Sequence, residues 1–288
     1  MAEGPQLRLD RLTRAQVVIT GARQGRPNRP AGGCPFCPGG LEAPEPYDVR
    51  WFPNRWPPLG KDRAEVLLYS PEHSAALWQL GVEGVRRVVG LWVDRTVAMG
   101  ALEGVAYVLL FDNRGAEVGA TIDHPHGQAY AFDEVPQAPL RELTLGRCAL
   151  CETPPERTVV SESGPWRAWC PEASAWAFEL RVAPSSHIQS LPALDAEQRT
   201  ALAEVLVDAL ARLDQLFDAP MPYMLWWHQR PSDAGEWPLA HLHAHIAPLL
   251  RAPGTPRFVA AGELGSGVYF NPVSPEDAAA RLRALPGA

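Results

Sequence analysis

The stretch DHPHGQAYAF, residues 123–132, places one histidine on each side of a proline and an amide side chain, Gln128, two residues after the second histidine. A neutral imidazole is a nucleophile near neutral pH and also a common metal ligand. His126 could therefore be a nucleophile, a metal ligand or a buried structural residue. The residues that the rest of the chain places around it decide between these roles.

An internal repeat leads up to this stretch. Two C-x-x-C pairs, CPFC and CALC, lie 114 positions apart, and a histidine follows each of them at the same separation. Each half continues with an amphipathic segment, an apolar run and a histidine cluster, at residues 75–99, 105–111 and 124–128 and again at 193–217, 222–227 and 241–245. A shared register of this kind predicts a duplication. We predict an α+β fold of two units, 1–142 and 143–288, each with mainly antiparallel strands and a packed helix.

The repeated cysteines and histidines predict metal binding. A lone C-x-x-C pair or a lone histidine is a weak signal, because both also occur as structural residues. Here the same four residues recur in the same order, which supplies the nitrogen and sulfur ligands of a closed tetrahedral zinc site twice. The predicted zinc ligands are Cys34, Cys37, His73 and His124 in the first unit and Cys148, Cys151, His187 and His241 in the second.

Charge and hydropathy exclude several classes of protein. The formal net charge of −7 and a pI near 5.6 argue against general binding to nucleic acid or to acidic membranes, since both require a basic surface. The first ten residues lack a basic start and an apolar run, and no later window resembles a membrane span. We therefore expect a cytoplasmic protein, in which cysteine pairs bind metal and do not form disulfides.

The motifs resemble those of the galactose-1-phosphate uridylyltransferase family, the transferase branch of the histidine-triad superfamily. The resemblance covers nearly the whole chain and rests on LTRAQVVITGARQGRP, CPFC, FPNRWPPL, FDNRGAEVGATIDHPHGQAYAF, MPYMLWWHQRP and HLHAHIAPLLR. It implies duplicated histidine-triad (HIT-like) units. It also implies an enzyme of galactose metabolism, in the Leloir pathway, that exchanges UMP between UDP-glucose and galactose 1-phosphate through a uridylyl-histidine, with a homodimer as a possible assembly.

The resemblance also implies roles for individual residues. His126 resembles the nucleophile that accepts the nucleotidyl group, and Gln128 resembles the residue that steadies the phosphate. Substrate contacts are implied for Arg23, Arg26, Asn54, Asn113, Gly119, Thr121, Phe258 and Glu263. A second metal site made of a carboxylate and histidines is implied for Glu142, His228, His243 and His245, and in our prediction it competes with the second cysteine site.

Three functions remain open on the sequence. Transfer is favoured because the amide of Gln128 donates a hydrogen bond to phosphate but cannot titrate, as a base for hydrolysis must. CALC and the tail GELGSGVYFNPVSPEDAA instead resemble ADP-glucose phosphorylase, and HLHAHIA fits the pattern of HIT-type hydrolases, which makes His243 a rival nucleophile. A nucleotide-binding protein without turnover is the third hypothesis.

Overall fold

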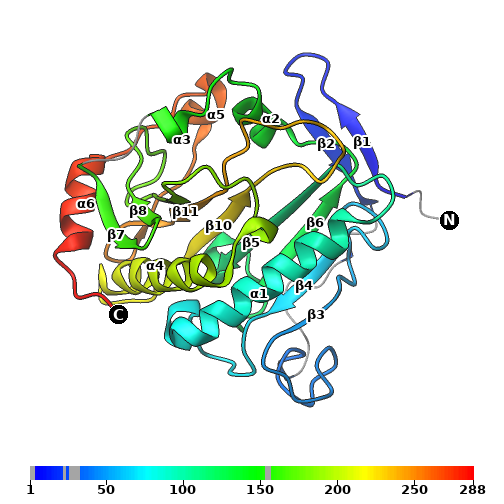
Figure 1. Ribbon diagram of the computed structural model, residues 1–288, viewed down its shortest axis with the longest axis horizontal. Coiled ribbons are helices and arrows are strands. Elements are labelled where there is room, and N and C mark those ends of the chain that lie inside the picture. The colour runs from blue at the N-terminus through cyan, green and yellow to red at the C-terminus, as the bar shows by residue number, and fades with distance from the viewer. Residues whose placement is uncertain (1–3, 22–23, 26–32, 153–156) are drawn as a thin grey trace.

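The computed structural model describes residues 4–21, 24–25, 33–152 and 157–288. Within this part of the chain, strands of both units form one sheet of nine strands in the order β3-β4-β6-β5-β10-β11-β9-β8-β7. Every neighbouring pair in this sheet is antiparallel (Figure 1). The strands are β3 (Arg50–Pro53), β4 (Ala64–Leu68), β5 (Tyr107–Arg114), β6 (His126–Phe132), β7 (Val159–Ser163), β8 (Trp166–Trp169), β9 (Leu180–Pro184), β10 (Tyr223–His228) and β11 (His243–Pro248).

The repeat in the sequence appears as approximate symmetry in this sheet. β5 of the first unit pairs with β10 of the second, β6 flanks β5, and β11 flanks β10. The predicted α+β class with a large antiparallel sheet is therefore confirmed. The two units share one sheet across β5 and β10, while the boundary at residue 142 stays a prediction.

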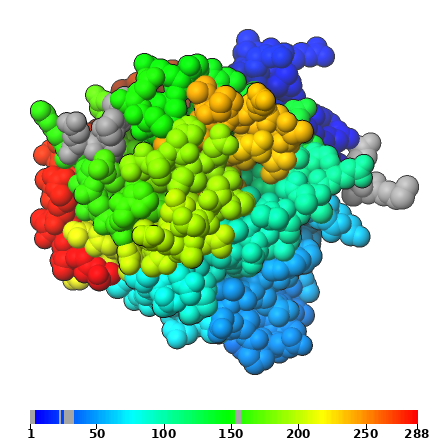
Figure 2. Space-filling view, viewed as in Figure 1, coloured from blue at the N-terminus to red at the C-terminus, as the bar shows by residue number. Residues whose placement is uncertain are grey.

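Two long helices cover one face of the sheet. α1 (Gly81–Gly100) and α4 (Ala196–Gln215) lie side by side on it, and their surfaces adjoin in the space-filling view (Figures 1 and 2). Asp195 caps α4 by accepting a hydrogen bond from the Gln198 N–H at 2.8 Å, which satisfies one of the unpaired donors of the first turn. Beneath the helices, Trp92 of α1 packs against Trp227 of β10 with ring centroids 5.7 Å apart.

The opposite face of the sheet carries the polar residues of the conspicuous motifs. Side chains alternate between the two faces of a strand. In β6, Ala129 and Ala131 belong to the core under the helices, so His126 and Gln128 lie on the other face. We call this the open face. In β11, Ala244 and Ile246 are core residues, and the alternate positions 243 and 245 share the open face with His126.

Smaller elements surround this framework. They are the hairpin β1 (Gln6–Leu9) and β2 (Gln16–Ile19), the short strands β12 (Leu250–Ala252) and β13 (Thr255–Pro256), and the helices α2 (Gln137–Leu143), α3 (Ala149–Glu152), α5 (Ala261–Ser266) and α6 (Pro275–Arg283). β1 and β2 form a separate sheet, and a 3-10 turn at Leu77–Leu80 replaces the expected first turn of α1. Among the described residues, no helix combines the length and apolar character that crossing a membrane requires.

Candidate active site and metal-binding clusters

His126 begins β6 with a fixed ring orientation. Its Nδ1 lies 2.7 Å from the carbonyl oxygen of His124, two residues earlier. A carbonyl only accepts hydrogen bonds, so this contact requires the proton on Nδ1 and leaves the lone pair on Nε2. Pro125, which lies between the two histidines, restricts the backbone that sets this distance. The arrangement gives the nucleophile predicted from the sequence a defined tautomer.

Gly127 is required by the packing behind the active-site strand. A Cβ at this position would lie 1.9 Å from the hydroxyl oxygen of Tyr69 and 2.9 Å from the backbone oxygen of Phe111. Real Cβ atoms do not approach other atoms so closely, so any side chain would displace the strand. The glycine in HPHGQ thereby lets β6 pack closely on the core, while His126 and Gln128 lie on the open face of the strand.

Gln128 points into a cavity beside His126. Its Oε1 accepts hydrogen bonds from Asn54 Nδ2 and from the Tyr130 hydroxyl, both at 3.3 Å. With the oxygen occupied in this way, the amide nitrogen is the group that can donate to a ligand. The cavity has a volume of 270 Å³, and Phe36, Asn54 and Thr121 contribute to its lining.

The other predicted substrate contacts are distributed unevenly. Asn113 lines a second cavity of 370 Å³ that also reaches His126, whereas Gly119 lies next to it in a left-handed turn with φ of 89°. Arg23 and Arg26 lie outside the described residues. The structure thus brings Asn54, Asn113 and Thr121 to the cavities beside His126, and it describes no contact for the two arginines.

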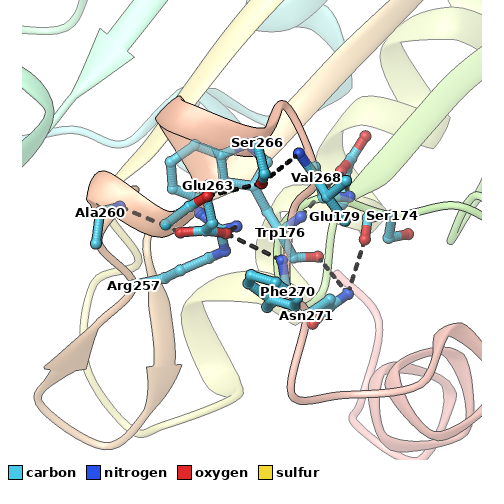
Figure 3. A network of polar contacts seen from close by, with 12 residues as sticks. Ser174, Trp176, Glu179, Arg257, Ala260, Glu263, Ser266, Val268, Phe270 and Asn271 are labelled. Carbon is cyan, nitrogen blue, oxygen red and sulfur yellow. Dashed lines mark hydrogen bonds and ion pairs between the residues drawn. The ribbon is translucent and has the colours of Figure 1, made fainter.

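Glu263 belongs to a C-terminal segment that packs on the second unit through Asn271 (Figure 3), and Phe258 precedes it in the same segment. Glu263 is buried, forms an ion pair with Arg257, and accepts hydrogen bonds from the N–H groups of Ala260 and Phe270. The Arg257 guanidinium lies 4.6 Å from the ring centre of Trp176. Phe258, in contrast, is 75% exposed. Neither Phe258 nor Glu263 lines the cavities beside His126 in the same chain.

The first predicted cluster brings its two cysteines and two histidines together. His124 Nδ1 lies 3.7 Å from both Cys34 Sγ and Cys37 Sγ, and His73 Nδ1 lies 3.6 Å from Cys37 Sγ. Tetrahedral zinc with its usual bond lengths separates sulfur and nitrogen ligands by about 3.6 Å. His124 Nε2 donates to the Ser70 carbonyl at 2.7 Å, which directs Nδ1 toward the sulfurs. The donor set therefore fits zinc.

The second cluster repeats this geometry. His241 Nδ1 lies 3.3 Å from Cys148 Sγ and 3.5 Å from Cys151 Sγ, and His187 Nδ1 lies 3.2 Å from Cys151 Sγ. His241 Nε2 faces the Pro184 carbonyl at 2.9 Å. Burial lowers the pKa of both His124 and His241, which favours the neutral imidazole that a metal requires.

A third cluster forms on the open face. Its members, Glu142, His228, His243 and His245, can each turn one ligand atom toward a common point. The Nε2 atoms of His243 and His245 are 3.1 Å apart, and Glu142 Oε2 lies 2.8 Å from His228 Nδ1 and 3.4 Å from His243 Nε2. This cluster shares no residue with the second cysteine cluster. Both sets of residues are assembled at once in the structure, and which of them holds the second metal stays a prediction.

The charge of this third cluster is set by its neighbours. Burial opposes ionisation of Glu142, but hydrogen bonds from His228 and His243 outweigh it and hold the pKa of the carboxyl below its usual range. Burial lowers the pKa of His228 and His245, and the neighbouring imidazole of His243 adds to the effect. One carboxylate and three imidazoles are a donor set that divalent zinc, iron or cobalt accepts.

Three residues of these sites were not predicted. Tyr47 places its hydroxyl 2.9 Å from His124 Nε2, Asp112 lies buried beside the cavity of Asn113, and Arg181 lines the cavity next to the third cluster. Asp112 lies within the FDNRGAEVG motif, which assigns it no role, and no motif marks Tyr47 or Arg181. The strand pairing that brings Asp112 and Arg181 to the sites is not visible in a single sequence.

Comparison with known proteins gives a consistent result. Residues 59–136 match the family described as galactose-1-phosphate uridyl transferase, N-terminal domain, and residues 142–288 match the C-terminal domain of the same family. A galactose-1-phosphate uridylyltransferase from Thermotoga maritima is 33% identical over 312 residues, which cover 96% of this chain and 98% of that protein.

Two solved structures extend the comparison. A uridylyltransferase structure superposes with a TM-score of 0.88 at 29% identity, covering 96% of this chain and 97% of that chain. An ADP-glucose phosphorylase from Arabidopsis thaliana with bound ADP-glucose superposes with a TM-score of 0.78 at 26% identity, covering 98% of this chain and all of that one. The resemblance inferred from the motifs is confirmed, and the chain belongs to the galactose-1-phosphate uridylyltransferase family.

Proposed function

We propose that this protein transfers UMP from UDP-glucose to galactose 1-phosphate through a uridylyl group bound covalently to His126. The observation that supports the proposal most strongly is the 2.7 Å contact between His126 Nδ1 and the His124 carbonyl oxygen. In the neutral imidazole this contact leaves the lone pair on Nε2, which is the form required for attack on phosphorus. Membership of the family supports the substrate pair.

The reaction has two displacements at the same phosphorus. His126 Nε2 attacks the α-phosphorus of UDP-glucose, a P–N bond forms, and the bond to the glucose 1-phosphate oxygen breaks. A phosphate oxygen of galactose 1-phosphate then attacks the uridylyl group, the P–N bond breaks, and UDP-galactose leaves. The His124 carbonyl holds the Nδ1 proton throughout and stabilises the positive charge on the ring while the P–N bond exists.

Gln128 favours transfer over hydrolysis. Its oxygen is engaged by Asn54 and Tyr130, so its amide nitrogen is directed to donate to a phosphoryl oxygen. An amide cannot remove a proton from water at neutral pH. The uridylyl group on His126 therefore persists until an acceptor with its own anionic oxygen arrives.

The 270 Å³ cavity is the proposed nucleotide site. Phe36 offers an aromatic face to the base, and Asn54 and Thr121 offer hydrogen bonds near His126. Asn113 and Gly119 are proposed to contact the phosphates from the other side, and Arg23 and Arg26 to approach the diphosphate from the N-terminal segment. The contacts of Asn113, Gly119, Arg23 and Arg26 rest on the family resemblance.

Zinc is the proposed metal of both cysteine clusters, and a divalent metal is proposed for the third. Thiolate and imidazole ligands at tetrahedral spacing suit zinc, and the role is structural because all four positions are taken by protein atoms. Bound zinc would hold the loop that precedes β6 in place. Such thiolate sites fit the reducing cytoplasm, to which we assign the protein.

A homodimer is the proposed assembly. The C-terminal segment exposes Phe258, Leu264, Tyr269 and Phe270. The ion pair between Arg257 and Glu263 links two parts of the same segment (Figure 3). A second copy would cover this apolar surface, and sugar contacts from Phe258 and Glu263 would then be made across the interface. Light scattering on the 31.5 kDa chain should give twice that mass. A monomer that is fully active would exclude this assembly.

An initial-rate study tests the function. UDP-glucose and galactose 1-phosphate should give parallel reciprocal plots, because the first product leaves before the second substrate binds. ADP-glucose with inorganic phosphate should be a poor substrate pair. If ADP-glucose and phosphate react faster, the protein is a phosphorylase like the Arabidopsis relative, and the galactose assignment fails.

A further inference from the structure

Arg181 has a buried guanidinium nitrogen, Nε, for which the described residues offer no hydrogen-bond partner. It lies in β9 on the open face of the sheet, directly opposite His245 of β11. Its Nε is buried and has no hydrogen-bond partner among the described residues, and no ion pair joins Arg181 to either nearby carboxylate, Glu179 or Glu142. Burial lowers the pKa of Arg181, although both carboxylates oppose the effect. A guanidinium nevertheless stays protonated in proteins, so its unmatched donors indicate a missing acceptor.

A cavity provides the space for such an acceptor. It has a volume of 110 Å³ and is lined by Arg181, Glu142, His228, His243 and Leu150 among others. Since one water in the liquid takes about 30 Å³, the cavity is large enough for an oxyanion of formate or phosphate size and too small for a nucleotide.

The internal repeat makes this cavity the counterpart of the one beside the nucleophile. His243 Nδ1 lies 2.7 Å from the carbonyl oxygen of His241, as His126 Nδ1 does from that of His124. In both units the cavity is lined by the second histidine of the pair and by residues of the C-x-x-C loop. The position that would receive a phosphoryl group in the first unit therefore has a structural equivalent in the second.

The two cavities differ, among other positions, at one residue of the paired strand. In the first unit Val66 is opposite Gln128, and in the second Arg181 is opposite His245. An apolar residue has been replaced by a guanidinium, the side chain whose donors match the two oxygens of a carboxylate or phosphate.

We propose that the cavity beside Arg181 binds a small oxyanion, on the edge of the Glu142, His228, His243 and His245 cluster. With a divalent cation on those four residues, the local positive charge exceeds that of the carboxylates of Glu142 and Glu179, and an anion restores the balance. The guanidinium supplies the hydrogen bonds. This site is separate from the nucleotide site, and its existence does not depend on turnover at His126.

The test places a paramagnetic ion at the third cluster. The protein is prepared with zinc in the two cysteine clusters and Co²⁺ in the Glu142 cluster. UMP is added in excess to fill the nucleotide site. Relaxation of ¹³C-formate is then followed during a titration, with inorganic phosphate as competitor. Formate should show saturable relaxation, phosphate should displace it, and Arg181→Gln should weaken binding at least tenfold.

Two further variants make the result decisive. Arg167→Gln removes an arginine of the neighbouring strand whose exposed ion pair with Glu162 is unrelated to the cavity, and it should bind formate as the wild type does. Arg181→Lys keeps the positive charge. It replaces Arg181→Gln in the test if Arg181→Gln no longer binds cobalt, and it should retain part of the affinity for formate. Absence of saturable relaxation in the wild type, or equal affinity in Arg181→Gln and wild type, would overturn the proposal whether or not the protein is a transferase.

Discussion

The hydroxyl oxygen of Tyr69 occupies the space that a side chain at position 127 would need, since a Cβ there would lie 1.9 Å from it. Gly127 stands between the proposed nucleophile and Gln128, so movement of the strand would displace both. Gly127→Ala should lower the free energy of unfolding by about 1–3 kcal/mol, the usual cost of overpacking, and should reduce transfer as well.

Gly90→Ala is the matched control for this substitution. Gly90 lies inside α1 with no atom within 4 Å of the added Cβ, and alanine should stabilise the helix slightly. Combining Gly127→Ala with Tyr69→Phe should restore part of the loss. Thermal melts of the wild type and the three variants provide the comparison, and equal stability of Gly127→Ala and Gly90→Ala would contradict the packing argument.

Asp112 should make stability depend on pH. Burial raises the pKa of its carboxyl to about 7, with Arg114 opposing the shift, whereas an unfolded aspartate titrates near 4. Its favourable contribution is therefore full below about pH 4 and is lost as pH rises through 7. Above pH 7, Asp112→Asn should raise the free energy of unfolding by up to about 4 kcal/mol, the equivalent of a shift of about three pH units.

Urea unfolding of both proteins between pH 4 and pH 8 measures this difference. At pH 4 and below, Asp112→Asn should match the wild type, because the wild-type carboxyl is then protonated in both states. A difference between the two proteins that is constant across the range would show that the carboxyl does not titrate as described.

Metal uptake should release thiol protons. Burial, followed by the influence of Cys148, raises the pKa of Cys151 to about 11, so the metal-free Cys151 thiol is protonated at neutral pH. Zinc binds thiolates, and its affinity should rise with pH. Calorimetry of zinc binding in buffers of different ionisation enthalpy should detect this release, and Cys148→Ser with Cys151→Ser should lose one zinc and its protons. Cys170→Ala, which lies outside the clusters, should lose neither.

Gln128→His should shift the enzyme from transfer toward hydrolysis. A histidine at this position can accept a proton from water, whereas the amide cannot. The ratio of UMP released to UDP-galactose formed should rise at least tenfold, and Gln137→His, at the start of α2 and outside the cavities beside His126, should leave the ratio unchanged. A variant that loses both activities in parallel would mean that Gln128 acts only by positioning.

The sequence predicts the parts of these sites that lie close together in a motif. The C-x-x-C pairs, the histidines and HPHGQ are short patterns, and the repeat predicts which of them meet. That Arg181 and Val66 occupy equivalent positions in the two units becomes visible only once the register of β9 with β11 and of β4 with β6 is known. Glu142 reaches the third cluster from α2, so its coexistence with the second cysteine cluster depends on packing that no local pattern records.

The most direct test of the proposed function is to identify the residue that carries the nucleotide. The protein is mixed with UDP-glucose labelled in the uridylyl group, without acceptor, and the labelled peptide is sequenced. The label should lie on His126, should be absent from His126→Gly, should persist in His243→Asn, and should leave when galactose 1-phosphate is added. Label that remains in His126→Gly and disappears in His243→Asn would contradict the account and move the active site to the second unit.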